Sequence, residues 1–208
     1  VVVNSGTLDI VAYDSGIKGE DVEINGGKIT ISASYDQGIH GVQNFTVNGG
    51  DILVSSSYEA FEGVNMTFNG GITSIYSNND GWNASTSSKG KGTPIVTVNG
   101  GYHYLNVNGN DTDVIDSNGY IRINGGVVAG TSKSPSDELL DSENGTYISE
   151  RATVISGGSI AWAIDLSVIN ALIVSLCMRK QDDVTKNLEE LEQMRAIREE
   201  VTAKRLAE

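Results

Sequence analysis

The chain has 208 residues, which suits one domain with an appendage. Its formal net charge of −13 argues against a nucleic-acid surface, because phosphate binding depends on Lys and Arg, and it suits a protein that holds cations. The single cysteine, Cys177, excludes an intramolecular disulfide framework. The 25 glycines favour a turn-rich β protein.

An Asn-Gly-Gly phrase followed by a short alternating strand recurs at intervals of 21 to 32 residues. The intact copies begin at Asn25, Asn48, Asn69, Asn99 and Asn124, and degraded copies begin at Asn4 and Ser156. Regular repetition on this scale is typical of a solenoid. Glycine pairs supply the positive φ that sharp corners require, and the stacked asparagines are expected to form an amide ladder.

Each repeat carries one strand before the glycine pair and one after it, as in 22–24 and 28–32. Apolar and polar residues alternate in both, which indicates half-buried strands. The sequence therefore predicts an all-β fold over residues 1–158, a right-handed parallel β-helix of about 6 to 7 coils. Insertions at 84–94 and 131–145 lengthen two coils. The first carries Lys89 and Lys91, and it is either a surface excursion or part of a binding side.

Residues 159–208 have a different character and are predicted to form an α-helical tail. The segment 159–178 is mostly apolar, and 182–207 is charged, lacks Gly and Pro, and has an apolar stripe at helical spacing. The apolar helix either crosses a membrane, with a basic pair after it, or caps the open end of the solenoid. Asp165 would be costly in a bilayer. The tail is thus a candidate membrane anchor or self-association segment.

A polar–small–apolar–polar tetrad precedes each pair of strands. Its large apolar third residue should point inward, so the first and fourth residues should flank it on the outside of a corner. Equivalent residues of stacked coils lie about 4.8 Å apart. Two columns of side chains are expected to result, and they comprise Glu59, Asp80, Asp113 and Glu138 in one, with Glu62, Asn83, Asp116 and Asp141 beside it.

Carboxylates this close repel one another by roughly 1 kcal/mol per pair in water and by more where solvent is partly excluded. A divalent cation with oxygen ligands would relieve that repulsion, and Ca²⁺ tolerates irregular sites of this kind. His40 is the one imidazole in the columns and no Cys accompanies it, so zinc is not favoured. The alternative is that these side chains only cap turns.

The tetrad runs also carry a family resemblance. Segments 38–41, 58–65, 79–84 and 113–119 each lead into an Asn-Gly-Gly strand. This combination resembles the bacterial carbohydrate-binding parallel β-helix family, whose members are similar to calcium-dependent polysaccharide lyases. The resemblance covers about residues 4–158 and implies a secreted or cell-surface domain with calcium between its coils and affinity for plant cell-wall polysaccharide.

This sequence departs from the family pattern at several tetrad positions. Ala60 and Val114 stand where glycine is expected. Ser15, Lys18, Gln37 and His40 replace acids in the first two coils, which puts cation sites there in doubt.

Sugar rings stack on exposed aromatic faces, and Tyr76, Tyr102 and Tyr104 fall at outward strand positions if His103 and its apolar neighbours face inward. They could form a platform, or they are ordinary strand aromatics. Tyr13, Tyr35 and Tyr58 recur at coil spacing, a regularity that favours structural packing.

Lyase chemistry needs a positioned base, and Lys18 lies at the edge of the repeat, so catalysis is not favoured. The sequence predicts a non-catalytic, calcium-stabilised carbohydrate-binding domain, extracellular or at the bacterial surface. A structural stalk or filament subunit assembled through the tail and a calcium-dependent polysaccharide lyase are the alternatives.

Overall fold

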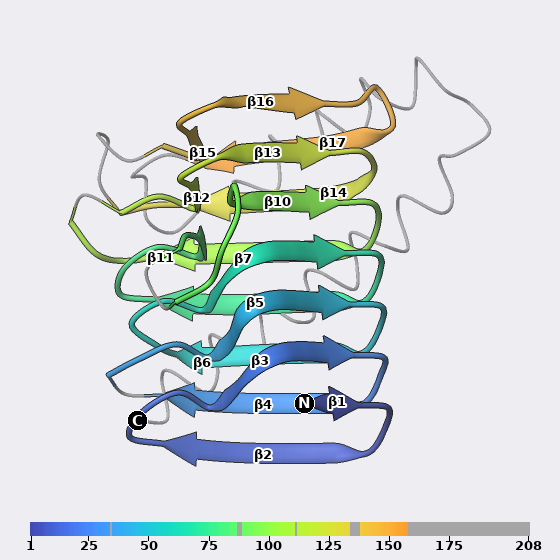
Figure 1. Cartoon of the computed structure of the whole chain (residues 1–208), viewed down its shortest axis with the longest axis vertical. Helices are drawn as coiled ribbons and strands as arrows, with labels where there is room; N and C mark the ends of the chain where they lie inside the picture. The colour runs from blue at the N-terminus through green and yellow to red at the C-terminus, as the bar shows by residue number, and fades with distance from the viewer. Residues whose placement is uncertain (34, 87–88, 111, 134–137, 158–208) are drawn as a thin grey trace. The chain divides into compact units, whose positions relative to one another are not determined.

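The computed structural model describes residues 1–157 apart from 34, 87–88, 111 and 134–137. The described residues contain strands and no helix, and their paired strands run parallel. They wind into a β-solenoid of about six turns (Figure 1), which confirms the predicted all-β parallel architecture. The predicted tail, 159–208, lies outside the described residues, and within them no helix is long and apolar enough to span a membrane.

One face of the solenoid is a seven-stranded sheet, called sheet B, which is built from the strand that follows each glycine pair. In spatial order its strands are β17 (Ala152–Gly157), β14 (Gly126–Thr131), β11 (Tyr102–Val107), β8 (Ile72–Ser77), β6 (Asp51–Ser56), β4 (Lys28–Ala33) and β2 (Thr7–Ala12).

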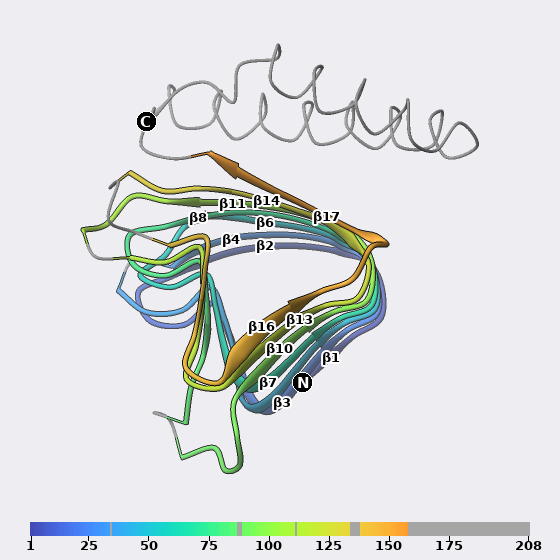
Figure 2. The same cartoon turned by 90° about the horizontal axis from the view of Figure 1, so that it is seen from above.

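The opposing ten-stranded sheet, called sheet A, contains the strand that precedes each glycine pair. Its main path is β1 (Val2–Val3), β3 (Ile17–Ile24), β5 (Ile39–Val47), β7 (Phe61–Phe68), β10 (Ile95–Val98), β13 (Tyr120–Ile123) and β16 (Gly145–Ile148). Three short strands extend the tetrad side of this sheet, namely β9 (Trp82–Ala84), β12 (Ile115–Ser117) and β15 (Leu140–Ser142). Figure 2 shows the strands of each sheet overlying one another along the solenoid axis.

The core lies between the two sheets and follows the predicted alternation. On β4 and β6 the inward residues Ile29, Ile31, Ile52 and Val54 are fully buried. Burial of such alternating apolar faces is the main force that holds a solenoid coil against its neighbours. The third tetrad residues confirm their predicted inward direction, because Phe61 and its equivalents pair in register and are buried.

The Asn-Gly-Gly corners stack as the sequence predicts. Each asparagine donates its side-chain N–H to the amide oxygen of the asparagine one coil earlier, at 2.7–3.0 Å, in a ladder of Asn4, Asn25, Asn48, Asn69, Asn99 and Asn124. The second glycine of each pair has positive φ, such as +98° at Gly50. A Cβ atom there would lie only 3.0 Å from the carbonyl oxygen of Gly27, so both conformation and space require glycine.

A cluster of rings fills the middle coils. Phe68 stacks on Trp82 with ring centroids 3.9 Å apart, and the buried imidazole of His103 meets both rings edge-on. His103 Nε2 lies 3.0 Å from the carbonyl oxygen of Gly100, which can only accept, so this nitrogen carries the proton. Nδ1 therefore accepts from the hydroxyl of Thr73, also at 3.0 Å.

Candidate functional site

The fourth residues of the tetrads stack in one column, as predicted. Strand register places them side by side in the order Lys18, His40, Glu62, Asn83, Asp116 and Asp141. The parallel pairing of the short tetrad strands produces this alignment, because residues in register on adjacent parallel strands lie about 4.8 Å apart. The column changes from basic at its first coil to acidic at its last.

The first tetrad residues stack as well, and two of them cap the following coil. Asp80 Oδ1 accepts a hydrogen bond from the backbone N–H of Asp113 at 2.8 Å. Asp113 Oδ1 accepts one from the backbone N–H of Glu138 at 2.6 Å. Turn capping, the alternative that the sequence left open, therefore describes part of what these carboxylates do.

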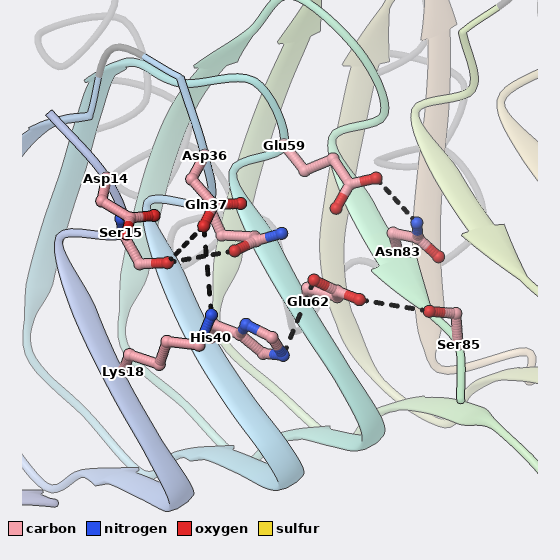
Figure 3. A network of polar contacts seen from close by, with 10 residues as sticks. All are labelled: Asp14, Ser15, Lys18, Asp36, Gln37, His40, Glu59, Glu62, Asn83 and Ser85. Carbon is pink, nitrogen blue, oxygen red and sulfur yellow. Dashed lines mark hydrogen bonds and ion pairs between the residues drawn. The ribbon is translucent and has the colours of Figure 1, made fainter. Parts of the chain in front are cut away.

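Glu59 and Glu62 are buried, whereas the sequence predicted the outside of a corner. Their exposed fractions are 7% and 3%. Asn83 Nδ2 donates to Oε1 of Glu59 at 2.8 Å, and Ser85 Oγ donates to Oε1 of Glu62 at 3.3 Å (Figure 3). Ser85 belongs to the first insertion, so that insertion supplies part of the enclosure. Burial raises the pKa of Glu59 to about 7, with Glu62 and Asp80 adding to the effect.

His40 is buried beside these carboxylates. It is 1% exposed, and its Nε2 lies 3.6 Å from Oε2 of Glu62 (Figure 3). Neither ring nitrogen has a hydrogen-bond partner among the described residues. Burial lowers the pKa of His40, against the opposing effect of Glu62, so the imidazole is neutral near pH 7 and does not compensate the carboxylate charge.

Asp116 lies in the acidic half of the fourth column. Burial, together with the negative charges of Asp80, Asp141 and Asp113, raises the pKa of Asp116 to about 6. Several carboxylates thus act on one partly buried group. Glu138 and Asp141, in the last of these coils, are exposed.

The donor atoms of the acidic columns are carboxylate and amide oxygens, which suit a hard cation such as Ca²⁺. Across the described residues, no three His, Cys, Asp or Glu side chains approach closely enough to enclose a metal ion. In place of direct contacts, backbone and amide hydrogen bonds hold Glu59, Asp80 and Asp113. Calcium at these residues stays a prediction.

The three tyrosines predicted as a sugar platform do not form one row. Tyr102 and Tyr104 lie on β11 at partly exposed positions. Tyr76 on β8 pairs in register with Asn106, not with either tyrosine, and is only 8% exposed. The inward direction of His103 and Leu105 is confirmed, since both are fully buried.

Other tyrosines are more exposed than those three. Tyr13 and Tyr35, for which the sequence favoured structural packing, contact each other with ring centroids 4.6 Å apart, and they are 77% and 69% exposed. On the outer face of sheet A, Tyr120 is 39% and Tyr147 is 58% exposed. The alternation of exposed and buried residues in β13 was a usable sequence signal for Tyr120, whereas all four residues of β16 are exposed.

Comparison with known proteins identifies a family. A family model described as carbohydrate-binding domain-containing protein matches residues 1–164. The chain belongs to this family. The matched residues include the whole described solenoid. No curated protein and no solved structure matches the chain.

Proposed function

We propose that the solenoid is a non-catalytic module that binds polysaccharide at the bacterial cell surface and is stabilised by calcium. The carrying observation is the match of residues 1–164 to the carbohydrate-binding domain family, which spans the described solenoid. A stacked β-solenoid also suits this role physically, since it presents long, flat rows of side chains along which an extended sugar chain can lie.

Calcium is the finer part of this proposal. Its support is the raised pKa of Glu59, to about 7, and of Asp116, to about 6. Both shifts mean that the folded chain resists the negative charge that its sequence places there. A bound divalent cation would remove that penalty, and oxygen donors on stacked coils are ligands of the type that Ca²⁺ uses.

The non-catalytic character is supported by the placement of the basic groups. Proton abstraction next to a uronate carboxylate needs an amine or similar base held within hydrogen-bond reach of the substrate. Lys18 is half exposed at the edge of the fourth column, with Nζ 3.9 Å from Asp36 (Figure 3). Lys89 and Lys91 are exposed in the first insertion.

Sedimentation with immobilised polysaccharides tests the binding claim. The chain is mixed with pectin, cellulose and unrelated storage polysaccharides, in calcium and in chelator, and the bound fraction is measured. We expect retention on at least one cell-wall polysaccharide, reduced by chelator. Retention on none of them contradicts the proposal. Unsaturated products released from polygalacturonate in calcium would instead identify a lyase.

A further inference from the structure

The outer face of sheet A carries two parallel rows of side chains along the solenoid axis. On β3, β5, β7, β10 and β13, Val22 and its equivalents through Ile121 point into the core, so their neighbours in those strands point outward. All four residues of the last strand, β16, are exposed. Register then defines a first row of Asp21, Asn44, Asn65, Ile95, Tyr120 and Gly145. The second row is Glu23, Thr46, Thr67, Thr97, Arg122 and Tyr147.

The chemistry of these rows changes along the axis. The first coil contributes the carboxylates of Asp21 and Glu23, and the middle coils contribute amides and hydroxyls. The last coils contribute two exposed tyrosines with Arg122 between them. Arg122 is the only cationic side chain in these two rows, although the chain as a whole has a net charge of −13. Its register partners on the adjacent strands, Thr97 and Tyr147, carry no carboxylate.

Arg122 and the two tyrosines form one cluster. The guanidinium Cζ lies 5.7 Å from the centre of the Tyr120 ring, close enough for a cation–π contact that orients the cation. Tyr147 adjoins Arg122 in register on β16. Beside Tyr120 stands Gly145, where even a Cβ atom would meet nothing within 4 Å, so that flank of the ring is open.

The first insertion brings further positive charge to the same sheet. Lys91 N–H donates to Oε1 of Gln43, and Gln43 Nε2 donates back to the carbonyl oxygen of Lys91, both at 2.9 Å. These reciprocal bonds fix the Lys91 backbone against β5 and leave its side chain exposed. Figure 2 shows the insertion projecting as a green excursion beyond the coils next to sheet A.

We propose that this outer face of sheet A is the glycan-binding surface and that Tyr120, Arg122 and Tyr147 form its recognition centre for a carboxylate-bearing sugar chain. The proposal rests on the proposed polysaccharide-binding function and specifies its site and ligand chemistry. Tyrosine rings supply the apolar surface on which pyranose rings stack. Arg122 supplies a bidentate donor for a carboxylate. Amides and hydroxyls of the middle coils face the remaining sugar hydroxyls.

Charge complementarity selects the acidic chain over a neutral one. The exposed Arg122 guanidinium, held beside the Tyr120 ring, presents a planar set of N–H donors that matches the two oxygens of a carboxylate. The carboxylates of Asp21 and Glu23 would repel an acidic sugar at the opposite end of the rows, so an acidic chain should engage the later coils.

Binding of oligogalacturonate and of its carboxyl-reduced counterpart, measured by calorimetry in saturating calcium, tests the proposal. We expect Tyr147→Ala to weaken both ligands about tenfold, as loss of a central aromatic contact does. Arg122→Gln should weaken the acidic ligand about tenfold and leave the neutral one unchanged. Tyr13→Ala and Lys133→Gln, which change an exposed tyrosine and an exposed cation elsewhere, should bind both ligands as wild type does.

The outcomes separate the site from the function. Wild type that binds neither ligand contradicts the polysaccharide-binding function itself. Wild type that binds while Tyr147→Ala and Arg122→Gln retain full affinity overturns the proposed site alone. Tighter binding of the carboxyl-reduced chain than of oligogalacturonate overturns the proposal that the ligand is an acidic sugar chain. Unfolding of each variant in urea verifies that the fold is intact.

Discussion

Glu59 and Asn83 lie one coil apart, and the amide of Asn83 donates to Oε1 of Glu59 at 2.8 Å. The acceptor is a carboxylate that is 7% exposed, and Glu62, which is also buried, lies within electrostatic range. A neutral amide satisfies a hydrogen-bond acceptor without neutralising its charge. The middle coils therefore fold more readily with Glu59 protonated, or with a cation beside it.

Glu59→Gln should stabilise the calcium-free chain at pH 8. Burial raises the pKa of Glu59 from its usual 4.5 to about 7 in the folded chain, so its favourable contribution to stability is present below pH 4.5 and is lost as pH rises through 7. That loss amounts to about 3 kcal/mol at most. Gln keeps the acceptor for Asn83 and removes the charge. Urea unfolding of both proteins in chelator, from pH 4 to pH 8, measures the difference in their free energies of unfolding.

The exposed Glu20→Gln is the matched control and should change the pH profile little. If Glu59→Gln is less stable than wild type at pH 8 in chelator, the charge on Glu59 does not destabilise the fold.

The effect of Asp116→Asn on stability should depend on calcium. In chelator above pH 6 the variant should be more stable than wild type, because the carboxyl pKa of Asp116 is raised to about 6 by burial and by three neighbouring aspartates. Addition of calcium should stabilise the variant less than it stabilises wild type, because the variant offers the cation one fewer carboxylate. A ligand at one hundred times its dissociation constant stabilises by about 2.7 kcal/mol. Thermal melts with and without calcium report both effects, and equal calcium gains in both proteins would count against calcium at the column.

Thr73→Val should destabilise the fold by about 1–3 kcal/mol, because it leaves Nδ1 of fully buried His103 without its donor. Burial lowers the pKa of His103 to about 4. The stabilisation from burying neutral His103 is therefore fully present above pH 6.5 and is lost as pH falls towards 4. Urea unfolding of wild type and of His103→Gln between pH 4 and 7 checks this, and parallel pH profiles would show that His103 protonation does not matter.

Gly50→Ala should cost more stability than Gly6→Ala. The two glycines have similar positive φ, +98° and +101°, so the conformational penalty is shared. A Cβ at Gly50 meets backbone atoms of the preceding coil at 3.0 to 3.2 Å, whereas one at Gly6 meets nothing within 4 Å. The difference in unfolding free energy isolates the cost of close stacking. Equal losses would mean that corner spacing adapts without strain.

The repeat predicted the fold in considerable detail. Asn25, Asn48 and Asn69 stack because a glycine pair follows each of them and makes every corner turn in the same way. Once the corners align, the period-two alternation decides which side chains enter the core. Register of the tetrads then follows, so the vertical column from His40 to Asp116 was predictable from spacing.

Burial at the column was not predictable in the same way. Glu62 and His40 occupy positions that spacing alone places on the outside. Ser85 and the reciprocal bonds of Gln43 to Lys91 show the insertion packing back against these coils. Such contacts join segments whose sequences share no period, so a repeat pattern carries no information about them. Tyr147 was missed for a simpler reason, because its strand lies beyond the last intact Asn-Gly-Gly copy.

Calorimetric titration of the purified chain with a cell-wall polysaccharide, first in calcium and then in chelator, tests the central claim most directly. The account predicts saturable binding in calcium that weakens when calcium is removed. Absence of binding to acidic and neutral polysaccharides under both conditions would contradict it.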